Sequence, residues 1–286
     1  MRPRCWRCGF SLIGCFNCKL FLAKDLKTTA SHIQPSFAPP RDVLRMPRIG
    51  TVATMPSRQK TFQKVLPLMA PQVDHIFVFL DGFDVIPSHL VAMPNVTIIR
   101  SQDAGEYHAA GRFLCLRLLK EPSVVVPFDD DIRYPRNYVA RLVKALAAVN
   151  GDAVVGFHGT TFKPPYKNYV RDSHRYYYLH GQLTTKQVDQ LGAATVAFCS
   201  DRLNFDVRNW KTFRSNDVLL AQEAKNKHLP MFCIPRPWFW MRPYLEPQKY
   251  SIWAEAKRDP TEKSALMREL IAERVAAYEA SDIDFK

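Results

Sequence analysis

No stretch of the 286-residue sequence is long and apolar enough to span a bilayer, which needs about 18 or more consecutive residues with little charge. Any contact with a membrane is therefore expected to be peripheral. Acidic residues are also scarce, because 27 Asp and Glu face 40 Lys and Arg, which gives a net charge of +13. An excess of this size favours anionic partners such as an acidic membrane surface or a phosphorylated substrate.

Two further absences argue against particular functions. The sequence has no basic run with interleaved aromatic residues and no known nucleic-acid motif, so nucleic acid is not expected as a partner. The residues where the first expected strand ends, Thr54 to Arg58, contain no glycine and do not form a Gly-rich phosphate loop. That absence counts against a nucleotidyltransferase.

Cysteine is sparse, with seven residues, and four of them lie close to the N-terminus. They form two CxxC pairs whose thiolates could bind a structural Zn²⁺: Cys5, Cys8, Cys15 and Cys18. The alternatives are an unstructured or misassigned leader and an export signal with a cleavage box at Leu12–Cys15. The proline-rich residues 28–47 are expected to be a linker. We therefore expect a basic N-terminal extension over residues 1–45 and a folded domain over residues 46–286.

The other three cysteines lie in apolar segments without partners at ligand spacing: Cys115, Cys199 and Cys233. We expect them to be buried, free thiols of a protein in a reducing compartment. The expected location is the cytoplasm, with peripheral contact at the inner face of the membrane left open.

Strands and helices are expected to alternate from residue 48 onward. Short apolar runs predict strands, and apolar residues at helical spacing predict helices. The expected strands are Ile49–Met55, His75–Leu80, Val96–Ile99, Ala153–Phe157 and Met231–Ile234, and the expected helices are Gln59–Met69, His108–Lys120, Asn137–Ala148, Val218–Lys227 and Pro260–Ala280. This alternation implies a single α/β domain with a mostly parallel central sheet. Residues 160–180 are expected to be an irregular excursion whose tyrosines either bind sugars or pack beneath the loop.

The segment Ser123–Pro135 contains the strongest candidate site. Val124–Phe128 predicts a buried strand, and it runs directly into Asp129, Asp130 and Asp131, here called the acid triplet. Ligands of open α/β sheets lie beyond the carboxyl ends of such strands. Adjacent carboxylates repel one another, so the triplet favours a hard cation such as Mg²⁺, Mn²⁺ or Ca²⁺. The alternative is that these acids cap the helix expected over Asn137–Ala148.

The strand, the acid triplet and the following Ile132, Tyr134 and Pro135 resemble the DxD region of GT-A fold glycosyltransferases, and most resemble family 2-like bacterial polysaccharide transferases. The resemblance covers residues 48–245 in element order, and its specific part is DDD-x-x-YP. It implies a GT-A fold and a hexosyltransferase-type activity. It also implies a nucleotide-sugar donor, Mn²⁺ or Mg²⁺, and a glycan or lipid-linked acceptor.

The resemblance assigns roles to residues that contact the donor. It implies that Asp131 and Asp129 bind the metal, that Asp129 also lies near the ribose, and that Asp130 supports either. Arg58 and Asp81, at the ends of the first two strands, would hold the base and ribose, and Arg112 would lie near the nucleotide. Asp81 is equally consistent with a plain turn before Gly82, and Arg112 with an exposed helical arginine.

The resemblance also implies an acidic base at the start of a helix that follows the acceptor loop. Asp217 stands in the matching order and distance from the triplet, so direct displacement with inversion is expected. Its alternative role is a favourable charge in the first turn of that helix. The small residues of Gly192–Phe198 would lie near donor sugar and acceptor. No histidine follows His228, although many GT-A enzymes use a late histidine as a metal ligand.

Other functions stay open at this stage. The chain could be a non-catalytic sugar- or membrane-binding α/β module whose triplet is only a cap or a Ca²⁺ site. A nucleotidyltransferase is a further alternative. Trp238 and Trp240 either floor an acceptor pocket or cover the edge of the core.

Overall fold

The structure is a computed structural model that describes residues 41–244 and 256–283. The proposed zinc ligands Cys5, Cys8, Cys15 and Cys18 lie outside the described residues, as does most of the expected N-terminal extension. The three other cysteines are buried and free, as predicted. No helix among the described residues is long and apolar enough to cross a membrane.

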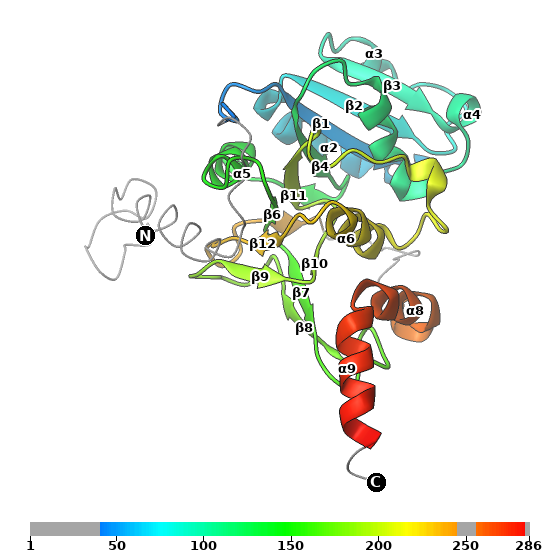
Figure 1. Ribbon diagram of the computed structural model, residues 1–286. Helices are drawn as coiled ribbons and strands as arrows, with labels where there is room; N and C mark the ends of the chain where they lie inside the picture. Colours follow the sequence, from blue (N-terminus) through cyan, green and yellow to red (C-terminus); the bar gives the residue numbers. More distant parts are fainter. Residues whose placement is uncertain (1–40, 245–255, 284–286) are drawn as a thin grey trace.

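A single large sheet organises the fold (Figure 1). Its strand order is β3-β2-β1-β4-β11-β6-β12-β9. The strands are β1 Arg48–Thr54, β2 His75–Leu80, β3 Val96–Arg100, β4 Val124–Phe128, β6 Val154–Gly156, β9 Lys186–Val188, β11 Val196–Cys199 and β12 Met231–Cys233. The neighbours from β3 to β4 are parallel, whereas β11 runs antiparallel to both β4 and β6. The predicted α/β class with a mostly parallel central sheet is confirmed.

Helices cover both faces of the sheet because side chains alternate between the faces along each strand. Val124 and Val126 of β4 pack with α2 and α5, and Val125 packs with the opposite layer of η4, α6 and α8. The helices are η2 Pro56–Arg58, α2 Gln59–Met69, η3 Ala70–Gln72, α3 Ser88–Val91, α4 Ser101–Ala104, η4 His108–Leu118, α5 Tyr138–Ala147, η5 Val207–Asn209, α6 Asn216–Asn226, α8 Thr261–Leu270 and α9 Ala272–Ile283. Both faces of β4 are therefore buried, which leaves its carboxyl end as the accessible part.

The prediction of an irregular excursion over residues 160–180 is wrong in part. This region contains the hairpin of β7 Gly159–Phe162 and β8 Ser173–Tyr176, and β10 Gln190–Leu191 completes a second, three-stranded sheet. Tyr166 and Tyr169 are buried beneath it, which favours the packing alternative for these two residues. The hairpin extends from the large sheet towards α9 (Figure 1).

Two further expectations, one on the C-terminal helix and one on helix capping, need correction. The C-terminal segment forms two helices, α8 and α9, rather than one, because Ile271 leaves helical geometry between them and packs into the core. The acid triplet does not cap α5: the N-cap is Asn137 and the first turn of α5 contains no acid. The short strand β5 Ile132–Arg133 intervenes and pairs with β13 Arg242–Pro243.

Candidate active site

The acid triplet lies at the carboxyl end of β4, beside the end of β1, which pairs with β2 on its other side. None of its side chains projects into open solvent: those of Asp129, Asp130 and Asp131 are 38%, 10% and 19% exposed. Burial raises the pKa of Asp130 to about 7, and the charge of Arg58 opposes that rise. Burial also raises the pKa of Asp129, while Arg112 opposes it and the charges of Asp131 and Asp217 add to it. Asp129 and Asp130 therefore lie where burial disfavours their charged forms and nearby cations favour them.

Arg112 is the inner cation of this site. The alternative of an exposed helical arginine is wrong, because its side chain is only 6% exposed and its Nη1 lies 2.9 Å from Asp129 Oδ1. It also donates to the carbonyl oxygens of Phe128 (2.7 Å) and Ala109 (2.9 Å). Gly111 permits this placement, since a Cβ there would lie 2.3 Å from the ring of Phe79 on β2. The absent side chain lets η4 approach the sheet closely enough for Arg112 to reach the end of β4.

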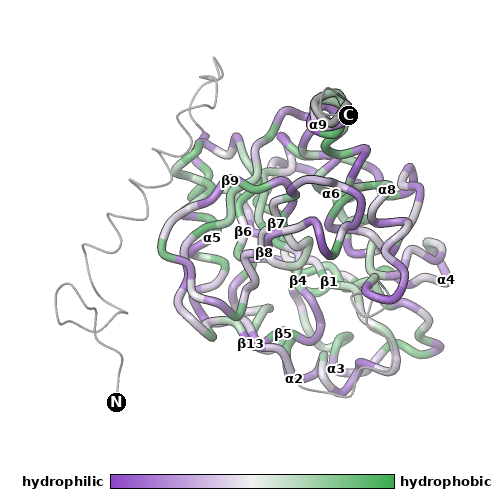
Figure 2. Tube along the Cα trace, turned by 90° about the horizontal axis from the view of Figure 1, so that it is seen from below, coloured by the Kyte–Doolittle hydropathy of each residue, from purple (hydrophilic) through white to green (hydrophobic). Residues whose placement is uncertain are grey.

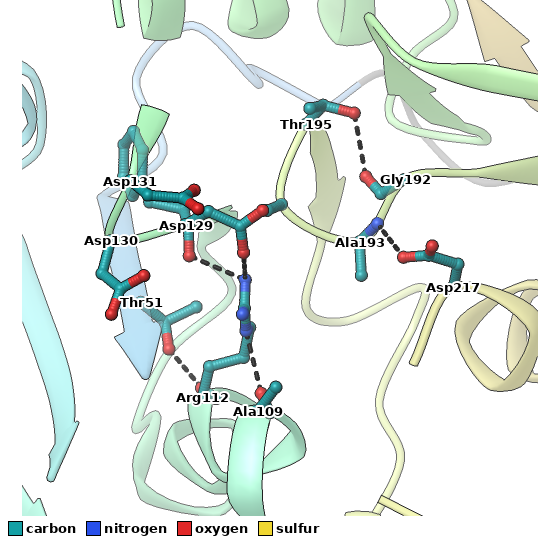
Figure 3. A network of polar contacts seen from close by, with 12 residues as sticks. Thr51, Ala109, Arg112, Asp129, Asp130, Asp131, Gly192, Ala193, Thr195 and Asp217 are labelled. Carbon is teal, nitrogen blue, oxygen red and sulfur yellow. Dashed lines mark hydrogen bonds and ion pairs between the residues drawn. The ribbon is translucent and has the colours of Figure 1, made fainter. Parts of the chain in front are cut away.

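Arg58 is the outer cation, supplied by η2 directly after β1. Its Nη1 lies 3.3 Å from Asp130 Oδ1 and also pairs with Asp131. The carboxyl groups of Asp129 and Asp131 lie near each other, whereas that of Asp130 turns away from them (Figure 3). Arg58 and Arg112 thus approach the acid triplet from different elements.

The donor set fits a divalent ion whose coordination is completed by a substrate. The described residues contain no group of three or more His, Cys, Asp or Glu arranged to hold a metal ion. Mg²⁺ and similar ions are commonly held by one or two carboxylates together with substrate phosphates. Asp129 and Asp131 provide such a pair, and a substrate phosphate would complete the coordination.

Asp217 faces the triplet from the first turn of α6 (Figure 3). Its Oδ1 accepts a hydrogen bond of 2.8 Å from the backbone nitrogen of Ala193. Its Oδ2 accepts none from the described residues. Ala193 belongs to the small turn, defined here as Gly192–Thr195, which closes through a hydrogen bond from Thr195 N to Gly192 O of 2.8 Å. The turn leaves one carboxylate oxygen of Asp217 available to a ligand.

A chain of hydrogen bonds connects the small turn to the acid triplet. The backbone nitrogen of Asp129 donates to the hydroxyl of Tyr134 (2.8 Å), which in turn donates to the carbonyl of Ala194 (3.0 Å). Tyr134 is only 2% exposed, and the hydroxyl of Tyr138 also points to Ala194, at 3.4 Å. The tyrosine of the YP signature therefore fixes the acid triplet relative to the turn that holds Asp217.

The structure adds His158, which directly follows the strand predicted over Ala153–Phe157. Its ring packs against the rings of Tyr177 and Tyr178, with centroids 5.4 and 5.8 Å away. Burial lowers its pKa to about 4, and the charge of Asp217 opposes that shift. His158 is thus a neutral polar side chain close to Asp217. The only sequence signal was its place directly after an apolar strand.

Asp81 lies at the end of β2, where Gly82 adopts a φ of +69°. The turn interpretation is therefore correct for the backbone. The side chain of Asp81 also contacts His108, with 3.1 Å between Oδ2 and Nδ1. His108 begins η4, the element that carries Arg112. No local pattern in the sequence singles out His108.

Replacing Arg112 by methionine is expected to reduce the free energy of unfolding by about 2–4 kcal/mol. The change removes the donors of two carbonyl groups and the partner of Asp129. Urea denaturation measures the difference. Arg117→Met on the same element is the matched control, because its side chain is 49% exposed and its loss should cost less than about 1 kcal/mol. Equal effects of the two changes would contradict the role of Arg112.

The depressed pKa of His158 predicts acid lability. An unfolded histidine binds its proton with a pKa near 6.5, whereas the folded one does so only near 4. The unfolded state therefore takes up more protons between these values, and stability falls as the pH drops. This contribution should be about 2–3 kcal/mol between pH 7 and about 4.5. His158→Gln should remove it from urea denaturation curves, and the exposed His180→Gln should not. Parallel pH profiles of wild type and His158→Gln would refute it.

Comparison with known proteins adds little to the functional evidence from this geometry. No family model and no curated protein matches the sequence. Among solved structures, the mannosyltransferase PcManGT from Pyrobaculum calidifontis, in complex with GDP-Man and Mn²⁺, is similar with 16% identity and a TM-score of 0.44. The similarity covers 93% of this chain and 81% of that one. At this level the likeness adds no argument to the contacts described above.

Proposed function

We propose that the chain is a metal-dependent, inverting glycosyltransferase that moves a sugar from a nucleotide-diphosphate donor to a hydroxyl of a glycan or lipid-linked acceptor. The observation that carries the proposal is the hydrogen-bonded connection from Asp129 through Tyr134 and the small turn to Asp217. This connection supports the proposal because it links two kinds of carboxylate, the acid triplet and Asp217. The triplet pairs with Arg58 and Arg112, whereas Asp217 Oδ2 accepts no hydrogen bond from the part of the chain that the structure describes.

The acid triplet is assigned to the donor. Asp129 and Asp131 would hold Mn²⁺ or Mg²⁺ together with the diphosphate, and the bound ion would neutralise charge that develops on the leaving diphosphate. Arg112 pairs with Asp129 and opposes the rise that burial causes in the pKa of that carboxyl group, and Arg58 pairs with Asp131. Asp81, at the next strand end, would contact the base or ribose. Asp130 supports Arg58 rather than the ion, because its carboxyl group turns away from the other two.

Asp217 is assigned to the acceptor. Its Oδ2 would accept the proton of the acceptor hydroxyl while that oxygen forms a bond to the anomeric carbon. The bond from the anomeric carbon to the diphosphate oxygen breaks in the same displacement, and the nucleoside diphosphate leaves with the electron pair. Attack from the side opposite to the leaving group inverts the anomeric configuration. The hydrogen bond from Ala193 keeps Oδ1 occupied and so orients the carboxylate.

A thermal-stability titration tests the donor half of the proposal. GDP and UDP are added separately to the full-length chain, with Mn²⁺ or with EDTA. A ligand at about 100 times its Kd stabilises the folded state by about 2.7 kcal/mol, which is a shift of roughly 5–10 °C for a chain of this size. We expect such a shift with at least one diphosphate, and only when Mn²⁺ is present.

Two matched conditions make that result specific. The nucleoside monophosphates serve as the control ligands, because they lack the second phosphate that completes the proposed metal site. A metal-independent shift, or no shift with either diphosphate, would argue instead for a non-catalytic binding module. A screen of nucleotide sugars for Mn²⁺-dependent hydrolysis then identifies the donor.

A further inference from the structure

Three large apolar side chains stand exposed near the candidate active site. Leu183, Trp238 and Phe239 are 86%, 63% and 56% exposed. Together with the exposed Arg133 and Arg242 they are called the rim patch. Isolated apolar side chains are common on protein surfaces, whereas a contiguous group of them indicates a binding surface.

The three apolar side chains are neighbours in space. Gln182 pairs with Arg236 in an antiparallel bridge, so Gly181 and Leu183 share one face of that extended segment. The indole of Trp238 lies over Gly181, where a Cβ would be 2.4 Å from it. Leu183 and Trp238 are therefore on the same side. The ring of Phe239 is 6.2 Å from that of Trp238.

The two arginines of the rim patch are neighbours whose like charges repel each other. Arg133 of β5 and Arg242 of β13 are direct cross-strand partners. Like charges at such positions are destabilising, and neither guanidinium pairs with a carboxylate of the described residues. Arg242 Nε donates to the carbonyl of Phe239 at 3.1 Å, which joins the cations to the apolar side chains. An anionic surface would relieve this repulsion.

The rim patch adjoins the acid triplet. β5 begins directly after Asp131, and the backbone nitrogen of Tyr244, just after β13, donates to the carbonyl of Asp131 at 2.7 Å. Lys64 of α2 adds another cation, 6.0 Å from the centre of the Tyr244 ring. Figure 2 shows β5 and β13 next to each other at one edge of the molecule, close to α2.

We propose that the rim patch docks the protein on a bilayer that contains anionic lipids, with Trp238, Phe239 and Leu183 entering the interface and Arg133 and Arg242 contacting the headgroups. Tryptophan prefers the boundary between headgroups and acyl chains, and each nearby cation adds roughly 1 kcal/mol of attraction to an acidic membrane. A soluble anionic partner would satisfy the arginines but would leave the apolar side chains unexplained. This inference rests on the proposed function in that docking would present the site to a lipid-linked acceptor.

Vesicle flotation of the full-length chain tests the proposal. Vesicles of phosphatidylcholine with about 30% phosphatidylglycerol are compared with pure phosphatidylcholine at physiological salt, where only anionic membranes carry the surface potential. We expect binding to the anionic vesicles alone. Replacing Arg133 and Arg242 by glutamine should lower the partition coefficient about thirtyfold, since each loses roughly 1 kcal/mol. Trp238→Ala combined with Phe239→Ala should lower it at least tenfold.

Matched variants separate this surface from the charge of the whole chain. Lys120→Gln with Lys227→Gln removes the same charge from exposed residues that precede β4 and β12, at the strand ends opposite the triplet. Val85→Ala with Val91→Ala removes exposed apolar side chains elsewhere. Both controls should bind like wild type. Absence of binding, or equal losses in rim and control variants, would overturn the inference.

The nucleotide titration distinguishes this inference from the proposed function. The rim variants should keep the Mn²⁺-dependent stabilisation by nucleoside diphosphates, because none of the changed residues belongs to the donor site. If nucleoside diphosphates did not stabilise the wild-type chain, the proposed function would be refuted. The vesicle experiment would then decide the membrane inference separately. Failure to bind vesicles with intact nucleotide stabilisation would refute only the membrane surface.

Discussion

Replacing Asp217 by asparagine is expected to lower the rate of sugar transfer by about 10²–10⁴-fold, which is the usual contribution of a general base. The amide oxygen can still accept the hydrogen bond from Ala193, so the small turn and the fold should be retained. The amide cannot take the proton of an acceptor hydroxyl. Initial rates with a donor identified by the hydrolysis screen, together with the thermal midpoint of unfolding, measure the two effects separately.

Asp172→Asn is the matched control for Asp217→Asn. Asp172 also accepts backbone hydrogen bonds through its carboxylate, from Lys167 (2.7 Å) and Asn168 (2.8 Å), and it lies in the loop between β7 and β8. Its replacement should leave the transfer rate within about twofold of wild type, because nothing in its surroundings points to the reaction. Undiminished transfer by Asp217→Asn would remove Asp217 from the role of base.

Replacing Asp131 by asparagine is expected to abolish the Mn²⁺-dependent part of nucleotide binding and to lower transfer by about 10³-fold. The change removes one of the two carboxylates that fit a metal held with a diphosphate, and metal ions supply several kcal/mol of stabilisation to a developing phosphate charge. The nucleotide titration with Mn²⁺ and with EDTA measures the loss directly. It requires no knowledge of the acceptor.

Asp130→Asn provides a control within the acid triplet. Asp130 is nearly buried and its carboxyl group turns away from the other two, so the Mn²⁺ dependence should persist in this variant. If Asp130→Asn abolished the metal dependence and Asp131→Asn preserved it, the assignment of metal ligands within the triplet would be reversed. If both variants kept it, the metal site would lie elsewhere.

Much of the fold was predictable because its central strands are buried on both faces. Such strands produce continuous apolar runs, and the boundaries of β2 at His75–Leu80 and of α2 at Gln59–Met69 agree with the sequence prediction. The position of the acid triplet at a strand end also followed from such a run. The pattern of apolar residues therefore predicts an element well where its burial is uniform along the chain.

The hairpin and the cations of the site could not be predicted in the same way. The sequences of β7, GTTF, and of β8, SHRY, show no clear alternation of apolar and polar residues that would mark them as strands. The burial of Arg112 depends on the close approach allowed by Gly111, which involves a contact with a distant strand. Tertiary contacts of this kind leave no local pattern.

The link through Tyr134 has a consequence for how specificity could change during evolution. The acids that perform the proposed chemistry are spaced by buried hydrogen bonds, so substitutions there would disturb reactivity and folding together. The hairpin after His158 and the exposed edge around Trp238 do not contribute to that spacing. New acceptors could therefore be recruited by altering these outer segments while the reacting groups keep their spacing. The outer segments are thus the rational targets for a library of variants with altered acceptor selectivity.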